Sequence, residues 1–119
     1  MRYSTDWRLI FLAMSETEAR DRLCRFAGVL GRDVNPDVFE PFSEAEGQYD
    51  CVFTLSYEAN DKDALLTDVS RLVQSLPGEW EQDPPRFYEN GVVELHATTS
   101  GKGAGAGIAW GHVWARSQD

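Results

Sequence analysis

Hydrophobic and polar positions alternate along three stretches of the chain, which is the pattern of half-buried β-strands. The clearest runs over 48–58, where aromatic, aliphatic and cysteine side chains occupy every odd position from Tyr49 to Tyr57. The segments 92–99 and 108–116 alternate in the same way, and 7–14 contains a compact apolar run of strand length. The pattern therefore predicts four strands, two of them close to the C-terminal end.

Two other segments have the period of an amphipathic helix. The first is predicted over 15–30, because Ser15 and Glu18 have the spacing of a capping box and Gly31 follows where a left-handed C-cap is expected. The second is predicted over 60–76 and ends at Pro77-Gly78. The apolar stripes of the two helices consist of Ala19, Leu23, Phe26, Ala27 and Leu30, and of Leu65, Val69, Leu72, Val73 and Leu76.

Two proline-containing segments separate these elements. Pro36 and Pro41 exclude a helix and make 32–47 an edge strand or an extended loop. The acidic segment 79–85 is broken by Pro84-Pro85 and is predicted to be a loop with a short strand around Trp80. The order of elements predicts a single α+β domain over 1–119. Its two helices would pack on one face of a mainly antiparallel sheet, in a split β-α-β (ferredoxin-like) pattern with a C-terminal β-hairpin.

A glycine-rich stretch, GKGAGAG, covers 101–107 and invites two interpretations. A phosphate-binding loop must open a helix, but Gly111 and Val113 disfavour a helix after it, so we expect a hairpin. A hairpin centred near Ala104 would pair His96 with His112, Glu94 with Trp114 and Thr98 with Trp110. Trp110, His112 and Trp114 would then lie with His96 and Glu94 on the face without helices, and the small apolar residues on the other.

Charge narrows the possible partners. The net charge is −9, which disfavours nucleic-acid binding and favours a basic partner protein. Nine acidic residues lie over 33–63, against Lys62 alone. Together with the exposed tryptophans they predict a partner-binding surface made of Asp37, Glu40, Glu44, Glu46, Asp50, Trp110 and Trp114. A second copy of the chain is an alternative partner for the same surface.

Sequence motifs indicate no catalytic residue, metal site or cofactor. His96 and His112 could serve as acid and base or bind a metal, but no third residue stands at a diagnostic position, and Glu94 is only a candidate orienter. The spacing of an EF-hand is absent. Cys24 and Cys51 are expected to be two reduced, buried thiols. No stretch is long and apolar enough to suggest a membrane span or a leader, so we expect a cytoplasmic protein that does not bind membranes.

In its size, acidity, exposed aromatic residues and lack of catalytic motifs, the chain resembles the small acidic immunity proteins of bacterial polymorphic-toxin and contact-dependent growth inhibition systems. The resemblance implies a non-enzymatic protein that binds a cognate toxin domain, often a basic nuclease, and blocks its active site. Two alternatives remain open. One is a regulatory domain that binds a small molecule, and the other is a small enzyme that depends on His96 and His112.

Overall fold

A computed structural model describes residues 1–101, 105 and 107–118. It contains two helices and seven strands in a single sheet. In chain order these are β1 (Arg2–Leu12), α1 (Glu16–Leu30), β2 (Val38–Pro41), β3 (Gln48–Glu58), α2 (Lys62–Ser75), β4 (Glu81–Gln82), β5 (Arg86–Phe87), β6 (Val93–Ser100) and β7 (Ile108–Ser117). The class is α+β, as predicted.

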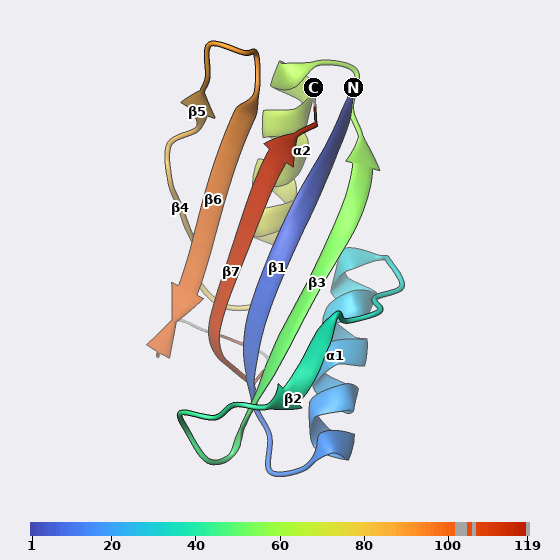
Figure 1. Cartoon of the computed structure of the whole chain (residues 1–119), viewed down its shortest axis with the longest axis vertical. Helices are drawn as coiled ribbons and strands as arrows, with labels where there is room; N and C mark the ends of the chain where they lie inside the picture. Colours follow the sequence, from blue (N-terminus) through green and yellow to red (C-terminus); the bar gives the residue numbers. More distant parts are fainter. Residues whose placement is uncertain (102–104, 106, 119) are drawn as a thin grey trace.

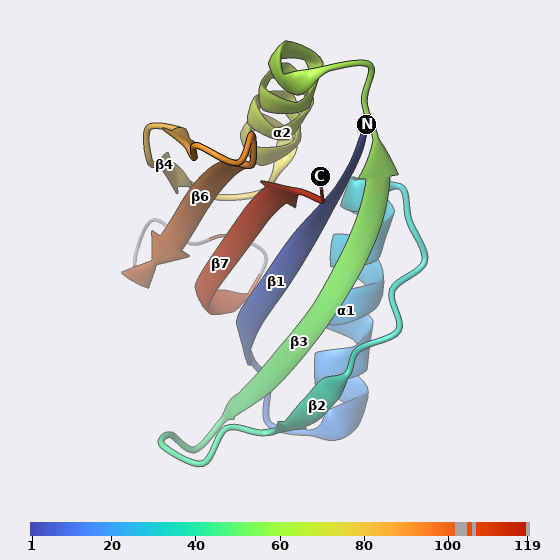
Figure 2. The same cartoon turned by 45° about the horizontal axis from the view of Figure 1, so that its top comes forward.

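The strand order is β2-β3-β1-β7-β6-β4, with β5 also pairing with β6, and each of these pairings is antiparallel. Four of the strands, in the order β7-β1-β3-β2, and the two helices form the split β-α-β pattern, and β6 extends it beyond β7. Both helices lie on the same side of the sheet (Figures 1 and 2). We call this side the covered face and the other side the open face.

The helix boundaries follow from side-chain caps. Ser15 Oγ accepts the backbone N–H of Glu18 at 3.2 Å, and Gly31 ends α1 with a φ of 68°. The Glu18 carboxylate accepts from Arg22 at 3.3 Å, so we observe one of the two bonds of the expected capping box. Asp61 caps α2 by accepting the N–H of Ala64 at 2.8 Å. The second helix is therefore slightly shorter than predicted.

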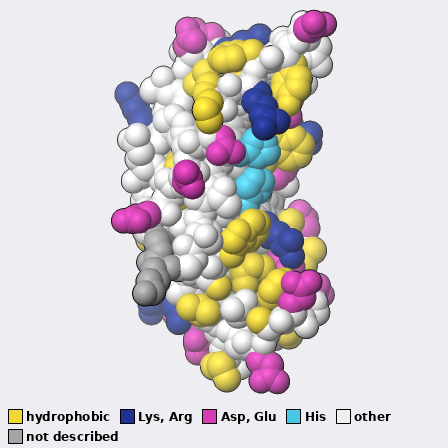
Figure 3. Space-filling model, turned by 90° about the vertical axis from the view of Figure 1, so that its left-hand side faces the viewer, with side chains coloured by type: hydrophobic (Ala, Val, Ile, Leu, Met, Phe, Trp, Pro, Cys, Tyr) yellow, Lys and Arg dark blue, Asp and Glu magenta, His cyan; other side chains and the backbone are white. Residues whose placement is uncertain are grey.

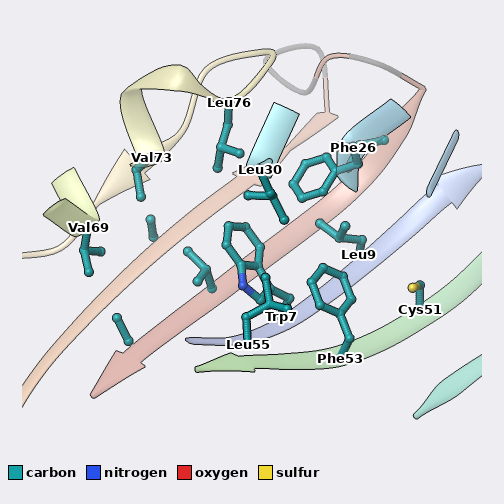
Figure 4. Packing of buried hydrophobic residues seen from close by; sticks show 14 of the residues in the cluster. Trp7, Leu9, Phe26, Leu30, Cys51, Phe53, Leu55, Val69, Val73 and Leu76 are labelled. Carbon is teal, nitrogen blue, oxygen red and sulfur yellow. The ribbon is translucent and has the colours of Figure 1, made fainter. Parts of the chain in front are cut away.

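The core lies between the covered face and the two helices (Figure 4). Trp7 is its largest fully buried side chain and is 1% exposed. It stacks on Phe53 with 5.9 Å between ring centroids and meets the ring edges of Phe26 and Trp80. Its indole N–H donates to Thr5 Oγ1 at 2.7 Å, so the polar atom in this apolar layer has a partner.

Two expectations were wrong, one about where the first strand begins and one about the burial of the two cysteines. The first strand begins at Arg2 instead of residue 7, because Tyr3 and Thr5 are buried on the covered face beside Tyr57 and Leu55 of β3. Of the two thiols, Cys51 is buried, and burial raises its pKa to about 12. Cys24 is exposed, because it lies beside the apolar stripe of α1 and not on it.

The hairpin prediction is confirmed, but its register was wrong. Residues 108–117 form a strand, which removes the helix that a phosphate-binding loop requires. His96 pairs with Trp114, Thr98 with His112 and Glu94 with Arg116, two residues away from the predicted register. Because the side-chain period of a strand is two, this shift leaves Trp110, His112, Trp114, His96 and Glu94 on their predicted face. The predicted centre at Ala104 lies outside the described residues.

Two glycines that the structure describes, Gly105 and Gly107, show why the segment 101–107 is rich in glycine. Gly107 has a φ of 71° and its carbonyl accepts the N–H of Leu12. A side chain at Gly105 would meet the backbone of Gly78 at 2.7 Å. These glycines allow a left-handed turn and a close approach to the end of α2.

Candidate functional site: the open face of the sheet

Strand pairing brings the chemically distinctive residues of the open face together. On β1 and β7, Ile10 lies opposite Trp110, Arg8 opposite His112, and Asp6 opposite Trp114. On β6, His96 lies opposite Trp114. Both histidines are visible as one patch in Figure 3, with hydrophobic and basic side chains at either end of it.

Four aromatic rings form a continuous stack on this face, in the order Trp110, His112, His96, Trp114. The centroid distances along this aromatic row are 6.1, 5.2 and 5.8 Å, and neighbouring planes are inclined by 29° or less. All four side chains are partly exposed. The predicted binding residues Trp110 and Trp114 are therefore on the same face, as expected, and the histidines join them.

A guanidinium lies over each end of the aromatic row. The Cζ atom of Arg8 is 6.0 Å from the Trp110 ring, and that of Arg116 is 4.2 Å from the Trp114 ring. Arg8 is held by Asp50, whose carboxylate accepts Nε and Nη2 at 3.1 Å each, and this bond raises the pKa of Arg8. The contacts fix both ends of the row in place.

Two hydrogen-bonded pairs of side chains, His96 with His112 and Tyr88 with Glu94, lie around the centre of the row. His96 Nδ1 and His112 Nε2 are 3.0 Å apart. The other nitrogen of His96, Nε2, is 3.7 Å from Glu94 Oε2, which also accepts the Tyr88 hydroxyl at 3.0 Å. Burial first, and the neighbouring His96 second, lower the pKa of His112, while Asp83 opposes them. Glu94 thus lies where a residue orienting His96 is expected, which the sequence only suggested.

The structure places the five predicted acidic residues in different surroundings. Glu40 lies opposite Asp50 across the β2–β3 pair. Glu44 lines a shallow hollow of about 400 Å³ together with Arg8, Phe42 and Trp110. Asp50 is only 14% exposed and is neutralised by Arg8. The other two, Asp37 and Glu46, are exposed but line neither this hollow nor the aromatic row.

Two residues important to the open face were missed at the sequence level. Tyr88 directly follows β5. Because β5 pairs with β6, the Tyr88 hydroxyl lies within hydrogen-bond distance of Glu94 on β6. Arg8 meets Trp110 because β1 and β7 are neighbours, although these residues are far apart in the chain. An alternating strand pattern places a residue on a face but does not say which strand lies beside it.

The described part of the chain shows neither a larger group of metal-ligating side chains nor a helix that could cross a membrane. Residues 1–101, 105 and 107–118 contain no group of three or more histidine, cysteine, aspartate or glutamate side chains that could hold a metal ion. Within the same residues, neither helix has the length and hydropathy needed to cross a membrane.

Comparison with known proteins gives no relative: no family model, curated protein or solved structure matches the chain. The class that the fold and the site define is therefore an α+β domain with a split β-α-β core, whose sheet has one face covered by helices and one face carrying an aromatic row.

Proposed function

We propose that this chain is an immunity-type inhibitor that binds a basic partner protein, a cognate toxin domain, through the open face of its sheet. The observation that carries the proposal is the aromatic row, which lies on a sheet face that neither helix covers. Partly exposed tryptophans held in a fixed orientation are typical anchors of protein interfaces. No catalytic step is needed for inhibition, because occupying the partner's active site is sufficient.

Two exposed acidic side chains, on β2 and in the loop that follows it, supply attraction for a basic partner. Glu40 and Glu44 are exposed, and Glu44 shares the hollow beside Trp110. Charges at such a rim raise the association rate more than they slow dissociation. Asp50 contributes differently, because its contact with Arg8 fixes the guanidinium over Trp110. We therefore assign the attraction to Glu40 and Glu44 first, and to Asp37 and Glu46 only over longer distances.

One observation favours the alternative of a histidine-dependent enzyme. His96 and His112 are within hydrogen-bond distance of each other, and Glu94 lies 3.7 Å from the other nitrogen of His96, close enough to become its partner after a small movement. Replacing both histidines by phenylalanine keeps two rings in the row but removes every ring nitrogen. An inhibitor that acts by occlusion should retain most of its activity in this variant, whereas an enzyme should lose it by several orders of magnitude.

Protection of cells tests the proposal directly. A candidate toxin domain, taken from a gene neighbouring that of this chain, is expressed in a sensitive host, with and without the chain, and colony survival is counted. The unchanged chain should restore growth, and the double variant Trp110→Ala/Trp114→Ala should fail to do so, because a buried anchor is worth about 2 kcal/mol or more of binding.

Phe87→Ala is the matched control. Phe87 is 66% exposed and pairs with Val93, so it belongs to the covered side of the sheet and not to the open face. This variant should protect as well as the unchanged chain. Equal protection by the tryptophan variant, with a folded far-UV circular dichroism spectrum, would show that the aromatic row is not the binding surface.

A further inference from the structure

The spacing of the two histidines fits a function that does not depend on a protein partner. We propose that His96 and His112 form a chelating pair for a borderline divalent transition-metal ion such as Zn²⁺, Ni²⁺ or Cu²⁺. His96 Nδ1 and His112 Nε2 are 3.0 Å apart. Two imidazole nitrogens bound to one metal at about 2.0–2.1 Å each are separated by about 2.9 Å at a right angle and about 3.3 Å at a tetrahedral angle. The observed separation lies within this interval.

Glu94 supports the required tautomer of His96. To leave Nδ1 free for a metal, the ring must carry its proton on Nε2, and Glu94 Oε2 is 3.7 Å from that atom. The carboxylate is held by the Tyr88 hydroxyl. A metal-bound histidine commonly donates its other N–H to a carboxylate, which orients the ring and makes it a stronger ligand. Glu94 would therefore be a positioning residue and not a ligand.

The hydrogen bond between the two histidines is compatible with this role. If His96 carries its proton on Nε2, its Nδ1 is the acceptor and His112 Nε2–H is the donor at the observed 3.0 Å. On metal binding, the His112 proton moves from Nε2 to Nδ1, so each ring keeps one proton and offers its other nitrogen to the metal.

Access and selectivity follow from the surroundings. The His96 side chain is 29% exposed, so an ion can reach the pair from solvent. Two imidazoles leave the remaining coordination positions to water, as in sites that stay open to a further ligand. Nitrogen ligands select borderline metals, whereas Mg²⁺ and Ca²⁺ require a set of oxygen ligands. The sequence indicated no metal site because the pair is formed by strand pairing and not by a motif.

Isothermal titration of the purified chain with Cu²⁺, Zn²⁺ and Mg²⁺ tests the inference. The exposed thiol of Cys24 is a competing ligand, so all proteins carry Cys24→Ser. We expect one Cu²⁺ or Zn²⁺ per chain, tighter binding of Cu²⁺ than of Zn²⁺, and no heat from Mg²⁺. Because His112 stacks on Trp110 and His96 on Trp114, bound Cu²⁺ should also quench tryptophan fluorescence.

Three variants separate a chelating pair from scattered binding. His96→Phe and His112→Phe each keep a ring in the row, and each should reduce binding to the level of the double variant, which contains no histidine at all. Glu94→Gln should weaken binding by about 10-fold or more without changing its stoichiometry. Binding that survives in the double variant, or that is halved and not lost in each single variant, would overturn the inference. Neither result depends on whether a toxin partner is bound.

Discussion

The two faces of the sheet are built from alternate residues of the same strands, and both contain stacked aromatic rings. On the covered face, Trp7 is 1% exposed and its indole N–H is bonded to Thr5. On the open face, Trp114 is partly exposed, and its Nε1 is buried without a partner among the described residues. The comparison shows that similar stacks can serve two purposes. The stack around Trp7 has its indole N–H groups bonded and holds the fold together, and the row on the open face leaves the Trp114 N–H and ring surfaces without partners among the described residues.

Truncating one tryptophan on each face should give the largest contrast. Trp7→Ala removes the centre of the core and should lower the free energy of unfolding by about 3–5 kcal/mol. Trp114→Ala should lower it by about 1 kcal/mol, since its ring contacts are partly exposed and its N–H is unpartnered. Urea denaturation followed by circular dichroism measures both. Similar losses would mean that the open face is part of the core.

Acidification should lower the free energy of unfolding through protonation of His112 on the open face. Its pKa is lower in the folded protein than the ordinary value of 6.5, so the unfolded chain takes up the proton first as the pH falls. The stabilisation is therefore complete above pH 6.5 and is lost as the pH falls through the folded pKa. Burial lowers this pKa most, His96 lowers it further and Asp83 raises it, while Arg8 lies opposite His112 on β1.

Urea denaturation at pH 7.5 and pH 5 checks this dependence. The unchanged chain should lose more stability between the two values than His112→Phe does, because the variant has no group at this position to protonate. Carboxylates titrate equally in both proteins and cancel in the comparison. Equal losses would show that protonation of His112 does not destabilise the fold.

Charge reversals in the acidic loop between β2 and β3 should have the smallest effect on stability. They should instead change the rate of association with a partner. Glu44→Lys and Glu46→Lys make the same charge change, but only Glu44 shares the hollow with Trp110. Each should change the free energy of unfolding by no more than about 0.5 kcal/mol. At physiological salt the Debye length is about 8 Å, so a charge acts mainly on groups close to it. Glu44→Lys should therefore slow association with a basic partner more than Glu46→Lys does.

Stopped-flow measurements at two salt concentrations would separate these variants. Association of the unchanged chain should slow as salt rises, and this dependence should shrink more in Glu44→Lys than in Glu46→Lys. If association with the cognate partner ignores both substitutions and the salt, the acidic residues serve solubility alone. The binding surface would then have to be sought elsewhere on the molecule.

Much of the fold could be predicted because its signals are local. Strand 48–58 has the predicted bounds, since its alternation is clear from end to end. The faces of Trp110, His112 and Trp114 in the hairpin were predicted from the same period. The register was not, because it depends on the turn geometry of a seven-residue glycine-rich loop, and glycine permits many turns.

The centre of the candidate site was less accessible to sequence reasoning. The contact of Tyr88 with Glu94 depends on β4 and β5, two strands of two residues each, which have no periodic pattern to detect. The two histidines were expected side by side as a direct pair, whereas in the structure they meet diagonally, because His96 lies opposite Trp114 and Thr98 opposite His112. Trp110 and Trp114 could be found because they belong to one strand, whereas Arg8 could be added only once β1 was known to lie beside β7.

The proline-containing edges of the sheet have a consequence for self-association. Along the outer side of β6, the segment 81–87 pairs as two short strands on either side of Pro84-Pro85. At the opposite edge, β2 is four residues long and ends at Pro41, and beyond it Arg32 donates to the carbonyl of Ser56 on β3. Neither edge offers a long, regular row of backbone donors and acceptors. Concentrated solutions should therefore resist fibre formation, and two copies that do associate should meet face to face instead of joining their sheets.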